Sequence, residues 1–301
     1  MKYPLIKTAK EIALATLICC ALVGTVCAQS VPTLTPQSLE IRRLIGANDL
    51  DSAETKALAQ VAANPNSAEA HYWLGAVYGQ QAMRANIFSQ MGIAKKVKRE
   101  FEKAAALDPK HIESRFGLLQ FHLQAPGIAG GDEDVAQTLA VELASIDTVS
   151  GHRARATLKF NDDDESGGMA ELYGALKINP THADTLAQVL GYLDSKKRAA
   201  DAEPYIKTAL SAAPSDPKIH YQAVKFAALT GRNTSEALLL ADSILSIKPT
   251  PEGVNVPGAH FRRAQLLSAL NRKPEALQAA QIAAKLAPDS EMITDYLDTL
   301  Q

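Results

Sequence analysis

The segments Ala68–Tyr78, AEAHYWLGAVY, and Phe101–Pro109, FEKAAALDP, decide the fold of this chain. Both segments carry apolar residues at helical spacing, and the second one ends in a proline. Proline cannot continue a helix, and it disfavours helical angles in the residue before it. The two segments therefore predict a pair of amphipathic helices, the second of which stops just ahead of Pro109.

The same ending recurs along the chain, in the stretches VAANPNS, KAAALDPKH, ALKINPTHA, ALSAAPSDP, SILSIKPTP and IAAKLAPDS. The prolines in these stretches are Pro65, Pro109, Pro180, Pro214, Pro249 and Pro288. The two intervals that follow Pro180 are 34 and 35 residues, and a whole unit fits between Pro109 and Pro180 with Thr148 in the proline's place. A period near 34 residues with two helices per unit predicts a helical solenoid.

The repeated residues resemble the tetratricopeptide repeat (TPR) family. The positions that match its two helix signatures best are Leu74, Gly75, Tyr78, Phe101, Ala104 and Pro109. Small residues recur where the helices of a pair cross, at Ala53, Ala136, Gly168, Ala202, Ala237 and Ala276. The resemblance is strong in the second and fifth units and weak in the fourth. It implies an all-α, right-handed superhelical solenoid with a concave groove lined by the first helices.

The N-terminus has the pattern of a signal peptide. Lys2, Lys7 and Lys10 precede an apolar run over residues 12–26, and Val26-Cys27-Ala28 is a small-x-Ala ending. We expect cleavage after Ala28 and a periplasmic or secreted protein; an uncleaved anchor is the alternative. The expected order is a signal peptide over 1–28, a short linker over 29–34, about seven helix pairs over 35–288 and a capping helix over 289–301.

Composition limits the chemistry of the mature chain. All three cysteines precede residue 29, so cleavage leaves no thiol and no disulfide. The remaining 28 basic and 32 acidic residues give a net charge of −4, which does not favour nucleic-acid binding. The motifs HExxH, GxSxG and GKS/GKT are absent from the sequence. We therefore expect neither intrinsic catalysis nor a cofactor.

The last residues, SEMITDYLDTL, predict the capping helix. Ser290 is the expected N-cap. The expected apolar face, which would cover the last repeat, comprises Met292, Ile293, Tyr296, Leu297 and Leu300.

An insertion of ten residues between Tyr78 and Phe101 should lengthen both helices of the second pair. Met83, Ile87 and Met91 form an apolar ridge at helical spacing, which is interpreted either as packing on the partner helix or as a docking knob. The adjacent basic cluster is either a solvated face or a contact for an acidic partner; it comprises Lys95, Lys96, Lys98 and Arg99.

A second insertion, APGIAGG over residues 125–131, suggests either a phosphate-binding loop or a structural joint. The acids Asp132, Glu133 and Asp134 that follow it would repel an anion, so the joint is favoured. We expect the preceding helix to end near Gln124 or Ala125, glycines at positive φ, Ile128 tucked under the loop and Asp132 as the next N-cap. Together with the SQMG-basic-FEKA segment before it, this joint resembles those of exported bacterial TPR proteins, which implies an exported scaffold.

Two patterns are compatible with metal binding, but neither requires a metal. Asp162, Asp164 and Ser166 match the first half of a calcium loop, but Tyr173 stands where the last acidic ligand belongs, and a capped joint accounts for the run equally well. Histidines recur near the starts of first helices, at His71, His111, His152, His182, His220 and His260. Packed helices lie about 8–10 Å apart, too far for these histidines to share one zinc ion.

The resemblance implies that a protein or peptide binds in the concave groove. Candidate contacts on the first helices are Glu69, Tyr72, Gln80, Glu113, Phe116, Gln120, Asp184, Asp194, Tyr221 and Lys225. The leading interpretation is an exported adaptor. The alternatives are a structural subunit of an envelope assembly and a regulator that binds calcium or a small ligand. The sequence leaves the oligomeric state open.

Overall fold

The structure is a computed structural model that describes residues 34–301 except 249 and 252, with the side chains of 87 and 88 left aside. The signal peptide predicted over 1–28, nearly all of the predicted linker, and Pro249 lie outside these residues. The helices belong to one compact unit, Pro36–Gln301.

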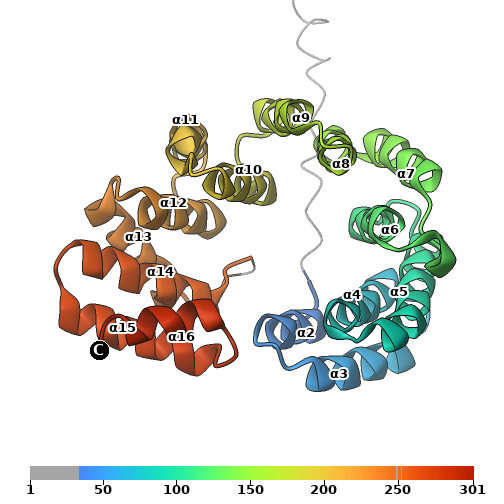
Figure 1. Cartoon of the computed structure of the whole chain (residues 1–301), viewed down its shortest axis with the longest axis horizontal. Coiled ribbons are helices and arrows are strands. Elements are labelled where there is room, and N and C mark those ends of the chain that lie inside the picture. The colour runs from blue at the N-terminus through green and yellow to red at the C-terminus, as the bar shows by residue number, and fades with distance from the viewer. Residues whose placement is uncertain (1–33, 249, 252) are drawn as a thin grey trace, which may run out of the picture. The chain divides into compact units, whose positions relative to one another are not determined.

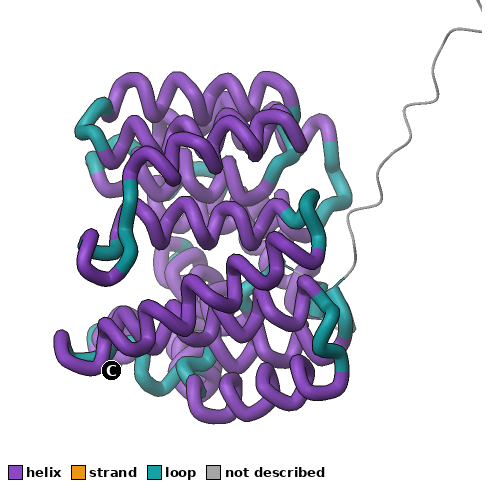
Figure 2. The backbone as a smooth tube through the Cα atoms, turned by 90° about the vertical axis from the view of Figure 1, so that its right-hand side faces the viewer, coloured by secondary structure: helices purple, strands orange, loops and turns teal. Residues whose placement is uncertain are grey.

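Every regular element in the described part of the chain is helical (Figure 2). The first helices of the pairs are α2 (Pro36–Gly46), α4 (Ala68–Arg84), α6 (Ile112–Gln124), α8 (Thr148–Asn161), α10 (Ala183–Ser195), α12 (Pro217–Thr230) and α14 (Val256–Ala269). The second helices are α3 (Leu50–Ala63), α5 (Ile87–Leu107), α7 (Glu133–Ile146), α9 (Glu165–Ile178), α11 (Glu203–Ala212), α13 (Thr234–Ser246) and α15 (Lys273–Leu286). The short 3₁₀ turns η2 (Gly127–Ala129) and η3 (Ala199–Ala202) precede α7 and α11, and α16 (Glu291–Asp298) follows the last pair.

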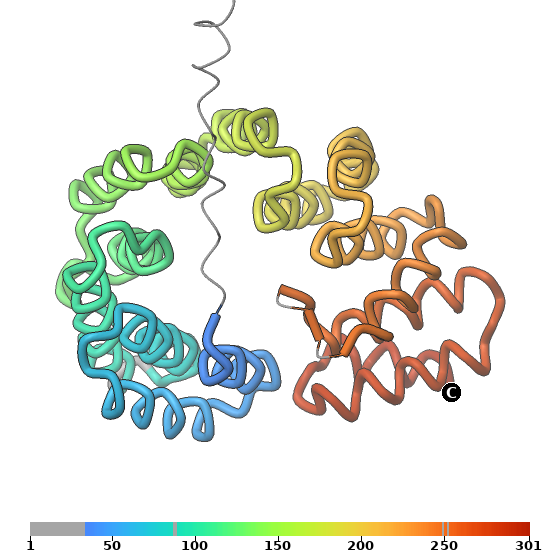
Figure 3. The backbone as a smooth tube through the Cα atoms, turned by 180° about the vertical axis from the view of Figure 1, so that it is seen from behind, coloured from blue at the N-terminus to red at the C-terminus, as the bar shows by residue number. Residues whose placement is uncertain are grey.

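Helices that follow one another in the chain pack against one another (Figure 1). Each first helix contacts the second helix of the pair before it, and each except α10 contacts the second helix of its own pair. Within its pair α10 packs on the 3₁₀ turn η3, which precedes α11. First helices also pack on the next first helix, except that α8 and α10 meet through a side-chain hydrogen bond from Arg153 to Gln188. The view from behind follows the same order of helices from end to end (Figure 3). The predicted all-α solenoid of seven pairs with a C-terminal helix is confirmed.

The proline pattern places the helix ends correctly. The five second helices α3, α5, α9, α11 and α15 each end two residues before their proline. In the unit that lacks the proline, α7 ends at Ile146, two residues before Thr148. The chain therefore turns at the same point of each of these units, with or without proline.

Small residues and one aromatic ring close the gaps between helices. The six predicted crossing residues are all buried, and Ala53, Ala136 and Ala276 are fully inaccessible. The ring of Phe101 lies between two glycines of different first helices. A Cβ atom added at Gly75 would lie 2.7 Å from this ring, and one added at Gly117 would lie 2.6 Å from it. Only a residue without a side chain allows α4 and α6 to approach Phe101 this closely.

The second pair is longer than its neighbours, as the insertion predicts. Helix α4 has 17 residues and α5 has 21, against 13 in α6 and 14 in α7. At the two ends of the ridge Met83 is 75% exposed and Met91 is 41% exposed. The packing interpretation therefore fails for Met83, whereas Met91 is partly covered.

The APGIAGG segment is a corner between α6 and α7. Helix α6 ends at Gln124, Gly130 has a φ of +96°, and the Asp132 carboxylate accepts hydrogen bonds from the N–H groups of Asp134 and Val135. The helix end and the N-cap are confirmed, and Gly130 is the one glycine of this segment with positive φ. The prediction for Ile128 is wrong: its side chain is 81% exposed, because the 3₁₀ turn directs the neighbouring Ala129 inward instead.

The capping helix covers the last pair with part of its predicted face. Ile293 is buried, and the Tyr296 ring meets the Phe261 ring edge-on at 5.4 Å. The prediction for Met292 is wrong, because the short α16 leaves that side chain 57% exposed. Ser290 occupies the N-cap position, but its side chain makes no capping hydrogen bond.

Candidate functional site

Consecutive first helices pack on one another, or in the case of α8 and α10 meet through a side-chain hydrogen bond, so their side chains that point away from the second helices form one surface, named here the first-helix face. All ten candidate contacts lie on these helices. Glu69, Tyr72 and Gln80 lie on α4, Glu113, Phe116 and Gln120 on α6, Asp184 and Asp194 on α10, and Tyr221 and Lys225 on α12. The structure brings several of them together around two arginines that the repeat pattern does not single out.

The early cluster comprises Tyr72, Glu113, Phe116, Arg153 and Asp184, from four successive first helices. Its centre is Arg153 of α8, whose guanidinium carbon lies 4.8 Å from the centre of the Phe116 ring. This distance is within the range of a cation–π contact. The guanidinium also donates a long hydrogen bond of 3.4 Å to Gln188 of α10.

Burial dominates the electrostatics of Arg153. It lowers the pKa of the guanidinium, and the charges of Asp184, Glu113 and Asp147 act in the opposite direction. None of these carboxylates lies within ion-pair distance of Arg153 in the residues that the structure describes. Arg153 is thus a largely desolvated cation near acids that do not neutralise it directly.

Tyr72 supplies the aromatic wall of the early cluster. Its ring stacks on Phe101 at 5.9 Å and tilts against His111 at 5.4 Å. Burial raises the pKa of its hydroxyl to about 12, and the negative charge of Glu113 adds to this effect. The hydroxyl therefore stays protonated at neutral pH and is available as a hydrogen-bond donor.

His182 lies beside the early cluster at the start of α10. Its Nδ1 accepts a hydrogen bond from the backbone N–H of Thr185, which requires that nitrogen to be unprotonated. Burial lowers the pKa of His182, and the positive charge of Arg153 lowers it further. Burial and the charge of Arg153 both favour the neutral ring, and the neutral ring can accept the hydrogen bond by which His182 caps α10.

The late cluster comprises Asp194, Tyr221, Lys225 and Arg262, from α10, α12 and α14. Burial is the main cause that lowers the pKa of Lys225 and that of Arg262. Arg262 donates a hydrogen bond of 2.8 Å to Gln265, and its guanidinium carbon lies 5.0 Å from the centre of the Phe261 ring. Neither cation has a carboxylate within ion-pair distance among the residues described. The late cluster holds two cations near a single acid, Asp194.

Three sequence candidates, Glu69, Gln80 and Gln120, lie on α4 and α6 but outside both clusters. Sequence reasoning missed Arg153 because the fourth unit departs most from the repeat signature. A register signal was nevertheless present, since Arg153 directly follows His152, as Tyr72 follows His71 and Tyr221 follows His220.

The acidic run at the start of α9 acts as a helix cap. Asp164 is the N-cap and accepts hydrogen bonds from the Gly167 N–H and the Ser166 hydroxyl, while Lys159 lies 3.0 Å away. These hydrogen bonds and the Lys159 pair lower the pKa of Asp164. Helix α9 begins at Glu165, so the later positions of a calcium loop are helical. Residues 162–173 thus do not form the loop in which Asp162, Asp164 and Ser166 would be ligands.

Four of the recurring histidines have separate local partners. His111 caps α6 in the same way that His182 caps α10. The Nδ1 atoms of His71 and His152 lie 2.7 and 2.6 Å from Glu100 and Glu171. Within the described residues, no group of three or more potential metal ligands comes together.

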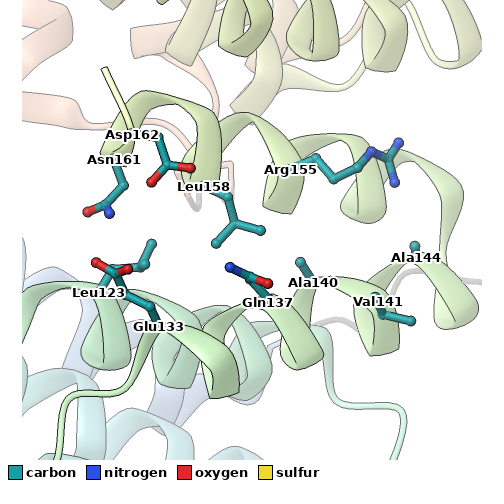
Figure 4. A pocket seen from close by; sticks show the side chains of 10 residues that line it. All are labelled: Leu123, Glu133, Gln137, Ala140, Val141, Ala144, Arg155, Leu158, Asn161 and Asp162. Carbon is teal, nitrogen blue, oxygen red and sulfur yellow. The ribbon is translucent and has the colours of Figure 1, made fainter. Parts of the chain in front are cut away.

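A shallow pocket of about 410 Å³ lies between α7 and α8, at the end of α6 (Figure 4). Ala140 and Leu158 contribute to its apolar wall, and Glu133 and Asp162 gather at one end. Arg155 lines it from α8 and pairs with Glu171 at 3.0 Å. Arg155 and Arg153 are two residues apart on one helix, so they point to different faces. The pocket is therefore separate from the first-helix face.

No helix in the described stretch has both the length and the apolar character that crossing a membrane requires.

Comparison with known protein families finds no matching family model, and a search of curated proteins finds no relative. Solved structures do show similarity. The chain is similar to a tetratricopeptide repeat protein from Parabacteroides merdae, with 14% identity, a TM-score of 0.45 and coverage of 88% of this chain and 97% of the other. It is also similar to yeast Tom70, with 15% identity, a TM-score of 0.49 and coverage of 84% and 51%. A third similarity is to PilF of Pseudomonas aeruginosa, with 14% identity, a TM-score of 0.43 and coverage of 77% and 97%.

The assignment of the architecture rests on the helices themselves. Helix pairs begin every 32 to 44 residues, small residues occupy the crossings, and each pair packs on the next. These are the features of a TPR-like helical repeat.

Proposed function

We propose that this chain is a scaffold that holds a segment of another protein along its first-helix face. Carboxylate groups of that segment would pair with the cations of the early and late clusters. The observation that carries this proposal is Arg153, a desolvated cation that lies on the Phe116 ring without an ion-pair partner in the part of the chain described.

A desolvated cation loses hydration energy that its surroundings must replace. The Phe116 ring covers one face of the guanidinium, and Gln188 accepts from its Nε atom. The planar group is therefore held in one orientation, while its other N–H groups remain donors for a ligand. A carboxylate matches such a fork with two parallel hydrogen bonds.

The acids of the early cluster would add selectivity. Glu113 and Asp184 would repel an anion placed away from Arg153, so a ligand must put its carboxylate at one position. The late cluster offers a second contact through Lys225 and Arg262. Two anchoring points on one face suit an extended or helical segment of a protein better than a small anion.

The test compares two arginines of the same helix. The chain from residue 29 onward, in its parent form and as Arg153→Gln and Arg155→Gln, is used to capture proteins from a cell-envelope extract. The captured protein is identified, and its affinity is then measured by calorimetry. We expect Arg153→Gln to weaken binding by at least tenfold, because the ligand's carboxylate loses a desolvated partner. Arg155→Gln is the matched control, since this side chain points away from the face.

Circular dichroism should show that both variants remain folded. Equal affinity of the parent and the Arg153→Gln variant for the captured protein would refute the role of the early cluster.

We also propose that the chain acts outside the cytoplasm, as a periplasmic or secreted protein. The support is the sequence of residues 1–28, with its basic start, apolar run and small-x-Ala ending. Fractionation of expressing cells and N-terminal sequencing provide the test. A product that begins at Gln29 is expected, and a cytoplasmic product that retains residues 1–28 would contradict the proposal.

A further inference from the structure

The extended end of the second helix pair carries charge of one sign only. The α4–α5 tip, defined as residues 82–99, contains five basic residues and no acidic residue. They are Arg84, Lys95, Lys96, Lys98 and Arg99. The mature chain as a whole carries the opposite sign of charge. Charge alone would therefore turn this tip toward an anionic surface and the rest of the chain away from it.

The basic residues at the tip differ in how far they are already neutralised. Lys98 lies 3.9 Å from Glu102, and Arg99 lies 2.6 Å from Glu100. Arg84, Lys95 and Lys96 are exposed and have no carboxylate within ion-pair distance in the described chain. The Lys96 amine lies 4.9 Å from the centre of the Tyr78 ring. This contact is with an aromatic face and not with a carboxylate, so the side chain keeps its net positive charge.

Exposed apolar side chains accompany this positive charge. Met83 is 75% exposed in the last turn of α4, and Met91 is 41% exposed in the second turn of α5. Methionine is flexible and polarizable, so it adapts to an irregular apolar environment. Both residues lie toward the end of the pair where α4 runs into α5.

Along α5 the apolar residue lies nearer the end of the pair than the two lysines do. With a rise of about 1.5 Å per residue, Met91 lies about 6 Å from the start of α5, and Lys95 and Lys96 lie about 12–14 Å from it. Arg84 lies at the end of α4 beside Met83, and its long side chain can carry the charge away from the apolar contact. Apolar side chains flanked by basic ones are the combination that binds the boundary of headgroups and acyl chains in an anionic bilayer.

We propose that the α4–α5 tip binds the surface of an anionic phospholipid bilayer. Met83 and Met91 enter the interface, while Arg84, Lys95 and Lys96 meet the lipid phosphates. The binding is peripheral, since only two methionine side chains enter the bilayer, and it is independent of the proposed binding of a protein segment on the first-helix face. An acidic protein is the competing occupant. It would bind through the basic residues of the tip, and its binding would not depend on the exposed methionines.

Vesicle co-sedimentation tests the proposal with the chain from residue 29 onward, which contains the whole compact unit. Vesicles of phosphatidylcholine with one quarter phosphatidylglycerol are compared with vesicles of phosphatidylcholine alone. We expect binding to the anionic vesicles that falls as salt is raised, and little binding to the neutral ones. Each basic residue near an anionic surface contributes a factor of about five, so Lys95→Gln/Lys96→Gln should weaken partitioning by about 25-fold.

The apolar contribution needs its own variant. Met83→Ser/Met91→Ser should reduce binding to the anionic vesicles by at least tenfold, because both apolar contacts are lost. Leu239→Ser is the apolar control, since Leu239 is 70% exposed on α13, and Lys177→Gln/Lys285→Gln is the charge control at exposed sites. Both controls should bind as the parent does.

Three results would overturn the proposal. They are no binding of the parent to anionic vesicles, parental binding by the tip variants, and binding to soluble polyglutamate that needs the lysines but not the methionines. The last result would assign the tip to an acidic protein instead.

Discussion

Between α4 and α6 the Phe101 ring is buried against two glycines, Gly75 and Gly117. Between α8 and α10 the Phe160 ring is half-buried and lies against a single glycine, Gly168. At the second junction a Cβ atom at Gly168 would lie 2.7 Å from Phe160, and the Tyr192 ring lies 5.2 Å away. The first helices α4 and α6 contact each other, while α8 and α10 do so least. The buried contact of Phe101 with the two glycines, named here the apolar lock, joins the second and third pairs. The half-buried contact of Phe160 with Tyr192, named here the looser junction, joins the fourth and fifth pairs.

At the looser junction, polar contacts supplement the aromatic one. The Tyr192 hydroxyl donates a hydrogen bond of 2.8 Å to Glu165, and Lys196 pairs with the same carboxylate. Glu165 and Lys196 are exposed, and an ion pair between exposed side chains contributes little to stability. The Arg153–Gln188 bond of the early cluster also spans this junction. A partner bound at Arg153 would therefore hold together the two pairs that the chain itself holds least firmly.

The largest expected effect comes from removing the apolar lock. Phe101→Ala should lower the free energy of unfolding by about 3–5 kcal/mol, because a fully packed aromatic ring is lost and a cavity remains. Phe160→Ala should cost clearly less, since its ring is already partly in contact with water. Urea denaturation followed by circular dichroism measures both, and equal losses would break the comparison between the two junctions.

A smaller effect is expected from filling the gap that the lock requires. Gly117→Ala should cost about 1–3 kcal/mol, because the new methyl group overlaps the Phe101 ring. Gly191→Ala on α10 is the matched control, since nothing lies within 4 Å of an added Cβ atom there and alanine favours the helix by up to about 1 kcal/mol.

A second substitution sharpens this result. If the clash with Phe101 causes the loss, Phe101→Leu should make Gly117→Ala less costly than it is alone, which a double-mutant cycle detects. Strictly additive losses would show that the ring and the glycine are not coupled.

The smallest effect concerns acid sensitivity at the looser junction. Hydrogen bonds from Lys196 and Tyr192 lower the pKa of Glu165. A carboxyl whose pKa is lower in the folded state contributes stability above its unfolded pKa, and this contribution is lost as pH falls through the folded value. Glu165→Gln should therefore reduce the drop in melting temperature between pH 6 and pH 3.

Glu133→Gln is the control for helix position, since Glu133 and Glu165 are each the first residue of their helix. If both substitutions change the acid response equally, the effect belongs to helix starts in general and not to the junction.

The sequence was sufficient to predict the fold because the repeat encodes its own boundaries. Prolines mark the helix ends, and small residues mark the crossings, so each unit repeats the same prediction. Ile128 and Met292 show where this redundancy stops. Both lie in single, non-repeated segments, where the direction of one side chain depends on a turn or helix start that no other unit repeats.

The candidate site was only partly predictable for a different reason. Aromatic and charged residues on first helices, such as Tyr72, Phe116 and Lys225, could be found from their register. The importance of Arg153 and Arg262 depends on desolvation and on the lack of a nearby carboxylate. Those properties arise from the packing of several helices and are not contained in any one segment.

The position of Trp73 makes the chain its own optical reporter. It is the only tryptophan, it is buried in α4, and the Tyr72 ring meets it at 5.2 Å. Its emission therefore reports the environment of the second pair alone, whereas far-ultraviolet dichroism averages over every helix. If the two signals change at different urea concentrations, the solenoid unfolds in stages, and the sign of the difference reveals whether the early pairs are the last to open.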